Sequence, residues 1–391
     1  MQAAAFAPSS LAELVEAMRE AARRGDALAF TGGGTEQDYG YPPERVDATI
    51  STLRLDRIVD YAPGDMTVTV EAGMTLGALQ AALRAHGQRL ALDAPLAARA
   101  TLGGLVATNG YGPLRARYGT PRDLILGASF VRADGTLARG GGKVVKNVAG
   151  FDLPRLLTGS LGTLGCTATA TFRLHPLPEA RAAVRLHCAT AGILRAACAM
   201  LEERRLEPAS VVALNVHGGI EAVVAFEGFA AGVAAQARAC ADGAAALGAG
   251  AELDVDDAAF AAAHERNRTE GEVRVKAAFP AAALERVYDA AFAPHARAFG
   301  DGAVALYPTL GIGFLSGPGE PADVVTRALP IARATLEALG GSLVLLAAPA
   351  AVRDHVDVYG ALPPSFAVMR ELKARFDPDR RLNRGRFVGR L

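Results

Sequence analysis

Residues 31–35 read Thr-Gly-Gly-Gly-Thr and directly follow the apolar run Ala27-Leu28-Ala29-Phe30. Glycine adopts positive φ without steric cost and lets the main chain approach a ligand closely. Successive amides in such a turn form a concave site suited to an anion such as phosphate. The stretch therefore predicts a strand that ends in a phosphate-binding loop, with an ordinary tight turn as the alternative.

Two common nucleotide-binding patterns do not fit this loop. The dinucleotide pattern G-x-G-x-x-G needs a third glycine where Gln37 stands. The pattern G-x-x-x-x-G-K-[ST] comes nearest at residues 140–143, but Val144 follows the lysine there and the earlier glycine is missing. The loop is thus expected to bind a phosphate in some other type of fold.

Composition excludes several classes of protein. The chain has 391 residues, enough for two or three domains, and its 41 Lys and Arg balance 41 Asp and Glu, so no overall basic surface for nucleic acid is expected. No apolar run reaches the ~18 residues of a membrane span, and the N-terminus lacks the basic and apolar regions of a signal peptide. The expected location is the cytoplasm, with peripheral attachment to the inner membrane through partner subunits as the alternative.

The cysteines argue against a metal centre in this chain. They are widely scattered and form no C-x-x-C pair, at Cys166, Cys188, Cys198 and Cys240. An iron–sulfur cluster or a zinc knuckle normally needs such closely spaced thiolates. We expect reduced thiols and no bound metal.

Two more glycine clusters follow the first. At residues 101–104, Thr101 is predicted to cap a short helix whose first turn holds Gly103 and Gly104. Such small residues leave N-terminal amides open to a ligand oxygen, although close packing of the helix on another backbone explains them equally well. The third cluster, residues 146–165, leads into a predicted strand at 166–174.

The order of these motifs carries a family resemblance. T-G-G-G-T, then A-T-L-G-G-L-V-A-T-N, then R-Y-G-T-P-R-D-L-I-L-G, then G-S-L-G-T-L-G resembles the vanillyl-alcohol-oxidase, or PCMH-type, FAD-binding superfamily. Within it, K-N-V-A-G-F-D-L-P-R-L-L-T-G-S-L-G-T-L-G is similar to the smaller FAD-binding subunit of bacterial glycolate oxidase. A closing block at residues 372–386 resembles the superfamily's L-K-x-x-F-D-P-x-x-x-x-N-P-G, with Arg384 in place of the usual proline.

The resemblance implies a set of FAD-binding residues. They fall into four groups, listed next in this order: residues that offer backbone amides to the diphosphate, residues that line the phosphate and flavin region, residues near the adenosine, and one residue that approaches the flavin ring. These are Gly32, Gly33, Gly34, Thr35 and Glu36; Pro95, Thr101, Gly103, Gly104 and Asn109; Gly165 and Thr167; and Asn383. Some relatives tether FAD through a histidine or cysteine, but His86 and His175 lie outside the glycine clusters, so non-covalent FAD is expected.

The predicted fold class is α+β. Residues 1–178 form a PCMH-type FAD-binding domain of two α+β subdomains. Residues 179–360 form an α+β cap domain with two β-α-β-β-α units, the split pattern of ferredoxin-like layers, and residues 361–391 return to the flavin site. The predicted strands and helices of the cap domain are 184–188, 191–204, 211–216, 222–226, 229–247, 272–279, 281–292, 303–307, 312–315, 322–339 and 342–346.

The resemblance implies oxidation of a 2-hydroxy acid to a 2-oxo acid. Related dehydrogenases cluster histidines near the flavin as metal ligands and base, whereas the later histidines of this chain form no H-x-H or H-x-x-x-H pair and are expected at the surface or at caps. No catalytic residue is identified, although Lys146 or an arginine is a candidate for holding the substrate carboxylate. We therefore expect an FAD-binding subunit of a glycolate oxidase or glycolate dehydrogenase complex that passes electrons to a partner or a quinone. Its expected partners are a catalytic flavin subunit and an iron–sulfur subunit. The alternatives are a stand-alone FAD-dependent dehydrogenase and a non-catalytic flavin-binding subunit.

Overall fold

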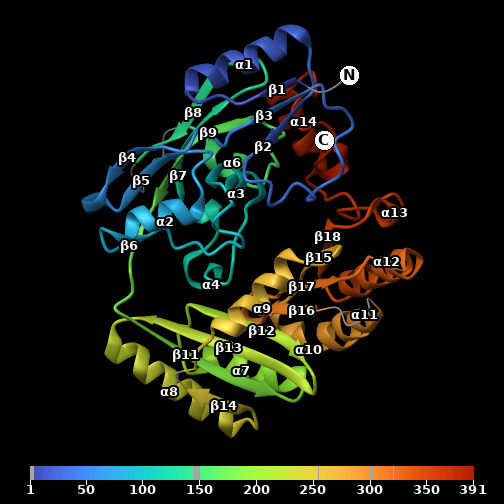
Figure 1. The fold of residues 1–391 in the computed structure, drawn as a ribbon. Coiled ribbons are helices and arrows are strands. Elements are labelled where there is room, and N and C mark those ends of the chain that lie inside the picture. The colour runs from blue at the N-terminus through green and yellow to red at the C-terminus, as the bar shows by residue number, and fades with distance from the viewer. Residues whose placement is uncertain (1–3, 144–149, 254, 299–302, 320) are drawn as a thin grey trace. The chain divides into compact units, whose positions relative to one another are not determined.

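The computed structural model describes residues 4–143, 150–253, 255–298, 303–319 and 321–391. Contacts divide the chain into two compact units (Figure 1). The first unit comprises residues 1–112, 118–177 and 361–391, and the second comprises 113–117 and 178–360. The C-terminal segment is thus part of the N-terminal unit.

The first unit contains two main sheets. One is a three-stranded parallel sheet in the order β1-β3-β2, and the other is a five-stranded antiparallel sheet in the order β4-β5-β9-β7-β8. The strands are β1 Ala4–Phe6, β2 Leu28–Thr31, β3 Ala48–Ser51, β4 Ile58–Ala62, β5 Thr67–Glu71, β7 Ile125–Val131, β8 Leu137–Gly141 and β9 Cys166–Arg173. A small pair joins β6 Gln88–Arg89 and β10 His175–Pro176.

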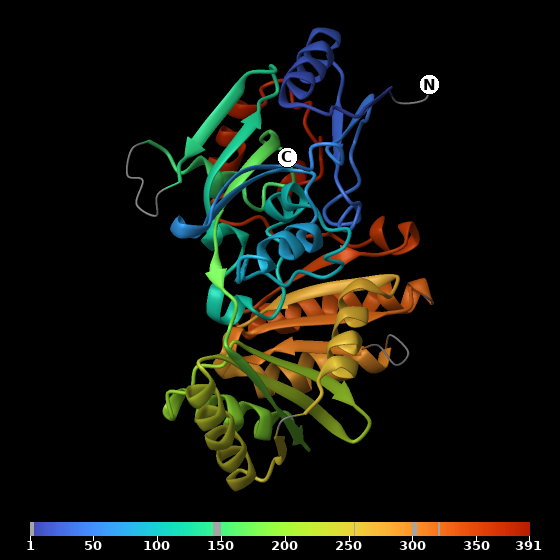
Figure 2. The ribbon, with the colours of Figure 1, turned by 60° about the vertical axis from the view of Figure 1, so that its left-hand side comes forward.

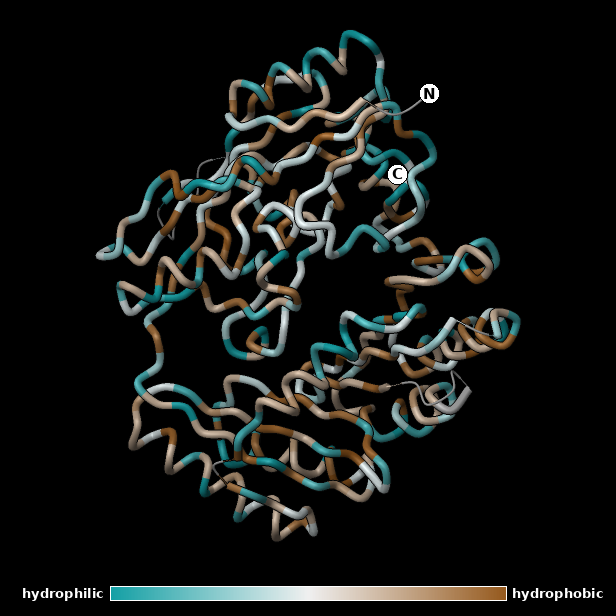
Figure 3. The backbone as a smooth tube through the Cα atoms, in the orientation of Figure 1, coloured by the Kyte–Doolittle hydropathy of each residue, from teal (hydrophilic) through white to brown (hydrophobic). Residues whose placement is uncertain are grey.

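Short helices surround these sheets. They are α1 Leu11–Arg24, η1 Pro63–Asp65, α2 Leu76–Arg84, α3 Leu102–Thr108, α5 Pro121–Leu124, α6 Leu153–Leu157, α14 Phe366–Phe376 and η5 Val388–Arg390. Helix α4 Arg115–Tyr118 lies mostly within residues 113–117 of the second unit. Helix α1 begins where Ser10 accepts a hydrogen bond from the Glu13 amide, and it ends at Gly25 with a φ of 70°. Teal and brown residues alternate along it in Figure 3, as in an amphipathic helix.

One hydrophobic core joins the two sheets of the first unit. Leu14 and Met18 of α1 pack with Leu28 of β2, with residues of β7 and β9, and with Leu382 from the C-terminal segment. Leu382 also forms an isolated parallel bridge with Leu28. Figures 1 and 2 both show the red C-terminal ribbon against this N-terminal unit. The last residues of the chain are therefore part of the core that carries the Gly32 loop.

The second unit is built on one eight-stranded antiparallel sheet in the order β14-β11-β13-β12-β16-β17-β15-β18. The strands are β11 Ala180–Cys188, β12 Ser210–Val216, β13 Gly219–Gly228, β14 Gly250–Leu253, β15 Val273–Ala278, β16 Ala303–Tyr307, β17 Ile312–Gly317 and β18 Ser342–Ala347. The helical elements are α7 Ala191–Glu203, α8 Ala230–Ala246, α9 Ala258–Thr269, η2 Ala281–Ala283, α10 Leu284–Val287, η3 Tyr288–Phe292, α11 Ala293–Ala298, η4 Pro308–Leu310, α12 Ala322–Ala338 and α13 Ala350–Arg353.

The expected α+β class is confirmed, and the second unit contains the order β-α-β-β-α twice. The first copy of this β-α-β-β-α repeat runs from β11 to α8, and the second copy runs from β15 to α12. Strand β12 of the first copy pairs with β16 of the second copy. Strand β14 was not predicted. Helix α9 lies on the face of the sheet that carries Phe314, because the Arg268 guanidinium lies 3.9 Å from that ring's centroid. The neighbouring Gly313 faces Phe292 on the opposite side.

Candidate functional site

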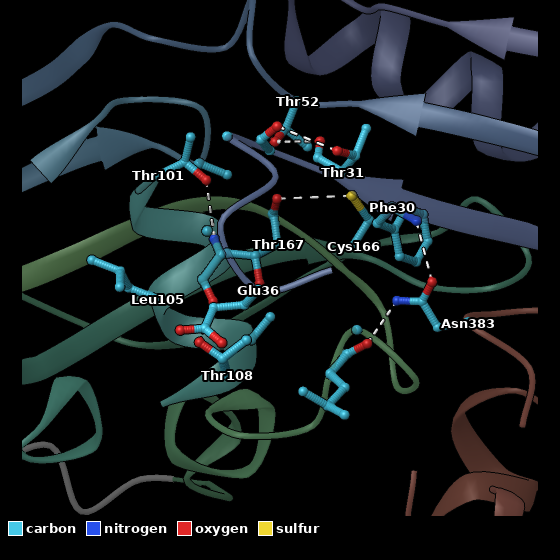
Figure 4. Close-up of a pocket in the computed structure, with 18 of the residues that line it drawn as sticks. Phe30, Thr31, Glu36, Thr52, Thr101, Leu105, Thr108, Cys166, Thr167 and Asn383 are labelled. Atoms are coloured by element: carbon cyan, nitrogen blue, oxygen red, sulfur yellow. Dashed lines mark hydrogen bonds between the residues drawn. The ribbon is translucent and has the colours of Figure 1, made fainter. Parts of the chain in front are cut away.

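The glycine loop leaves β2 and lines a pocket in the first unit. The space inside this pocket, including the open solvent at its mouth, is about 830 Å³. Three chain segments provide most of the lining residues: the loop after β2, helix α3 and the loop before β9. Figure 4 shows Asn383 reaching this pocket from the C-terminal segment.

Most of the residues expected to bind FAD line this one pocket. They are Gly32, Gly33, Gly34, Thr35, Glu36, Thr101, Gly103, Gly104, Gly165, Thr167 and Asn383. Pro95 and Asn109 are not among the lining residues. Asn109 instead ends α3 with a φ of 50°, and its side-chain oxygen accepts a hydrogen bond from the Arg122 amide at 3.3 Å. A direct contact of Pro95 or Asn109 with FAD therefore stays a prediction.

The three glycines of the loop have different roles. A Cβ on Gly33 would lie 1.7 Å from the carbonyl oxygen of Arg99, and a Cβ on Gly32 would lie 2.2 Å from Oγ1 of Thr101. Among the three, Gly34 alone has a positive φ, 71°, and it has open space where a Cβ would be. Close packing therefore requires Gly32 and Gly33, whereas backbone conformation requires Gly34.

The loop amides fit an anionic group. Within the described residues, the amides of Gly32, Gly33, Gly34 and Thr35 donate to no protein acceptor. Gly33 instead accepts through its carbonyl from the Arg99 guanidinium at 3.3 Å. Partly exposed donors in a concave loop suit the oxygens of a diphosphate, as the loop sequence predicts.

Helix α3 does not offer open amides at its start. The amide of Leu102 donates to Met74 and that of Gly103 donates to Ala72, each at 2.8 Å. The Gly104 amide donates to the Thr101 side chain at 3.3 Å, an N-cap drawn in Figure 4. A Cβ on Gly103 would lie 2.7 Å from that of Ala72. The expectation of free amides here is wrong, and close packing accounts for Gly103.

Asn383 links two walls of the pocket. Its Oδ1 accepts from the amide of Phe30 at 3.2 Å, and its Nδ2 donates to the carbonyl of Leu161 at 2.6 Å, as Figure 4 shows. A Cβ on Gly162 would lie 2.8 Å from this Nδ2. The side-chain amide of Asn383 therefore forms hydrogen bonds with protein on both sides and connects β2 to the loop before β9.

Several lining residues were not predicted. They are Phe30, Thr31, Gln37, Thr52, Ala72, Leu105, Ala107, Thr108, Ser160, Leu161, Gly162, Cys166 and Arg386. Ser160, Leu161 and Gly162 belong to the G-S-L-G-T-L-G motif, so their position next to Gly165 was the available signal. Thr52 and Ala72 lie at the ends of β3 and β5 and had no such signal.

Cys166 is the one cysteine that lines the pocket. Burial raises the pKa of its thiol to about 12, so the thiol stays protonated and is a poor nucleophile near neutral pH. His86 contacts Tyr61 and His175 contacts Tyr118, and neither histidine lines the pocket. This geometry is consistent with non-covalent binding.

A buried polar cluster lies in the second unit, where surface histidines were expected. His264 is buried, and its Nε2 lies 3.0 Å from the hydroxyl of Tyr307, to which Arg268 donates at 2.5 Å. Burial, followed by the charge of Arg268, lowers the pKa of His264 to about 3. His295 is also buried, with Nδ1 2.7 Å from the carbonyl of Ala291. The surface assignment is wrong for both, whereas His187, His217 and His355 are exposed.

Two other predictions concern metal and substrate binding. Over the described residues, no group of three or more His, Cys, Asp or Glu side chains has an arrangement that could hold a metal ion. Lys146, a candidate for the substrate carboxylate, lies outside the described residues. Among the described helices, none is both long and apolar enough to cross a membrane.

Comparison with known proteins identifies the first unit. The model of the FAD binding domain family matches residues 2–141. The fold is similar to that of p-cresol methylhydroxylase solved with substrate bound, with a TM-score of 0.73 over 98% of this chain and 88% of that one, at 15% identity. Residues 2–141 of this chain carry an FAD-binding domain. An alkyldihydroxyacetonephosphate synthase has a similar fold, with a TM-score of 0.75 over 97% of this chain and 75% of that one, at 18% identity.

Three curated proteins are similar to part of this chain. Glycolate oxidase subunit GlcE of Escherichia coli is 33% identical over 203 residues, which are 51% of this chain and 56% of that protein. D-2-hydroxyglutarate dehydrogenase of Xanthomonas citri pv. viticola is 34% identical over 171 residues, 44% of this chain and 36% of that protein. D-lactate dehydrogenase of Archaeoglobus fulgidus is 35% identical over 169 residues, 43% of this chain and 38% of that protein. The chain matches between about one third and somewhat over half of the length of these relatives.

Proposed function

We propose that this chain is the FAD-binding subunit of a glycolate oxidase or glycolate dehydrogenase type of complex. In this proposal the complex oxidises a 2-hydroxy acid to a 2-oxo acid and passes the electrons to a partner or a quinone. The main support is the pocket itself, because the residues that line it include a glycine loop whose amides have no acceptor among the described residues. The match to a glycolate oxidase subunit supports the choice of complex.

Different residues of the pocket would bind different parts of FAD. The amides of Gly32–Thr35 would bind the diphosphate, and Leu105 with Phe30 would provide apolar walls that exclude water. Asn383 would keep the loop before β9 next to β2. Bound FAD supplies a ring that accepts a hydride, and the protein supplies position and electrostatics.

A stand-alone 2-hydroxy-acid dehydrogenase is the second candidate. Its support is the similarity to D-2-hydroxyglutarate dehydrogenase and D-lactate dehydrogenase, which match 44% and 43% of this chain at 34% and 35% identity. A base within hydrogen-bond reach of the substrate hydroxyl and a cation for its carboxylate are needed in either case. In the complex, the catalytic flavin subunit would provide them.

One experiment separates the two candidates. The chain is purified with FAD and assayed with glycolate and D-lactate and an artificial dye acceptor, alone and after co-expression with catalytic flavin and iron–sulfur subunits encoded nearby. We expect very slow dye reduction by the isolated chain and restored activity in the complex. Turnover by the isolated chain at ~1–10³ s⁻¹ would support the stand-alone dehydrogenase. Failure to bind FAD at all would refute both.

A further inference from the structure

Two residues of the C-terminal segment contact the chain on either side of the glycine loop, one residue on each side. Asn383 accepts a hydrogen bond from the amide of Phe30, which precedes the loop, at 3.2 Å. Arg386 donates through one nitrogen, Nη2, to the carbonyls of Gln37 and Tyr39, which follow the loop, at 2.7 Å each. The loop is therefore held at its start and at its end by side chains only three positions apart.

The backbone around these two side chains is itself fixed. The Asn383 amide donates to Leu28 at 2.8 Å, and the Arg386 carbonyl accepts from Tyr41 at 3.0 Å. The Arg386 amide donates to the carbonyl of Asn383 at 3.1 Å, which fixes the two residues relative to each other. The exposed fractions of Asn383 and Arg386 are 3% and 6%, so little water competes for their hydrogen bonds.

The loop between these contacts needs such support. Its amides from Gly32 to Thr35 have no acceptor within the described chain, and glycine has more backbone freedom to lose than any other residue. A loop that is already ordered loses less entropy when it binds its ligand. Arg386 also lines the pocket, and its guanidinium stays charged at any ordinary pH. A partly desolvated positive charge attracts a diphosphate more strongly than an exposed one does.

We propose that Asn383 and Arg386 are positioning residues that hold the glycine loop in its diphosphate-binding shape, and that the charge of Arg386 adds to the attraction for the diphosphate. This inference rests on the proposed function, in which the pocket takes FAD. It extends that function by assigning Asn383 and Arg386 to binding of the diphosphate rather than of the flavin ring.

The test measures three ligands with one set of variants. Dissociation constants are determined for FAD, ADP and riboflavin with the full chain stripped of flavin, and riboflavin serves as the probe without phosphate. The variants are Arg386→Gln, Arg386→Lys, Asn383→Ala and Asn383→Gln. Arg375→Gln is the matched control, because Arg375 is an exposed arginine of the same segment and does not line the pocket.

For Arg386→Gln we expect at least ~10-fold weaker binding of FAD and of ADP and an unchanged constant for riboflavin. Arg386→Lys keeps the charge but loses the planar fork, so its loss should be smaller. The dissociation constant of FAD should also depend less on salt in Arg386→Gln than in Arg375→Gln, because one positive charge near the diphosphate is gone. Asn383→Gln keeps a side-chain amide that can accept from Phe30 and donate to Leu161, so it should bind ADP better than Asn383→Ala does.

Three results would overturn the inference. They are unchanged ADP binding in Arg386→Gln, an equal loss for all three ligands, and an Asn383→Gln variant that binds ADP no better than Asn383→Ala. Unfolding midpoints of the flavin-free variants identify any variant that fails to fold. The dissociation constants of the conservative variant at the same position are then compared instead. Wild-type chain that binds no FAD would refute the proposed function instead, so the two failures are distinguishable.

Discussion

Lys373 donates a hydrogen bond from Nζ to the carbonyl of Thr163 at 2.8 Å, although 210 positions separate the two residues. The same ammonium contacts the Asp377 carboxylate at 2.6 Å and the carbonyl of Leu382 at 3.1 Å. The side chains of this ion pair are 4% and 0% exposed. Thr163 belongs to the loop before β9, and Leu161 of the same loop lines the pocket. Lys373 therefore holds this loop through the carbonyl of Thr163.

Replacing Lys373 with Met should destabilise the first unit by about 3–5 kcal/mol, because Asp377 would be left as an unpaired buried charge. Burial lowers the pKa of Lys373, and the charge of Asp377 opposes that shift. Urea unfolding at neutral pH measures the loss. Lys143→Met is the control, because its ion pair with Asp60 is exposed and should contribute no more than ~1 kcal/mol. Equal losses in the two variants would show that burial of the pair has no special importance.

Gly33→Ala should lower the flavin content of purified protein ~10-fold or more. The new methyl group would lie 1.7 Å from the carbonyl of Arg99, so the loop must shift. The flavin absorbance per protein after gel filtration measures the effect. Gly64→Ala is the matched control, since a Cβ there meets nothing within 4 Å. Wild-type flavin content in Gly33→Ala would contradict the phosphate-loop assignment.

Acid precipitation should release FAD into the supernatant. The thiol of Cys166 has its pKa raised to about 12 by burial, and the histidines of the first unit do not line the pocket. Absorbance of the supernatant and of the redissolved pellet gives the distribution of flavin. Flavin that stays in the pellet of wild-type protein but not of Cys166→Ala would identify a covalent bond to that thiol.

The second unit should lose stability in mild acid because of His264. Its pKa is about 3 in the folded state, against about 6.5 for a free histidine. The unfolded chain therefore binds more protons between these values, so the stabilisation is complete above about pH 6.5 and is lost as the pH falls toward 3. Between pH 7.5 and pH 5.0 the loss from this residue is about 2 kcal/mol.

Urea unfolding followed by circular dichroism at the two pH values tests this prediction. His264→Gln should lose less stability between the two pH values than the wild type does, whereas the exposed His217→Gln should behave like the wild type. The same pH dependence in all three proteins would mean that His264 is not responsible.

Local sequence signals predicted the elements of this protein well. The caps at Ser10, Thr75 and Thr101 form as the residue types require, with each side chain accepting from an amide three positions later. Short apolar runs predicted the strands of the second unit, and β12, β16 and β17 are buried along most of their length. Strand β14 was missed because its four residues, Gly250–Leu253, have little apolar alternation and lie at the edge of the sheet.

The sequence alone determined the α+β class and the glycine loop after β2, because helix caps, strand alternation and turn glycines act over a few neighbouring residues. Only the tertiary structure decided which donors of the pocket stay open. The amides at the start of α3 look free in the sequence, yet Met74 and Ala72 accept them after folding. The C-terminal supports Asn383 and Arg386 act on residues about 350 positions away, and no local pattern encodes such contacts, because a shared core brings the segments together.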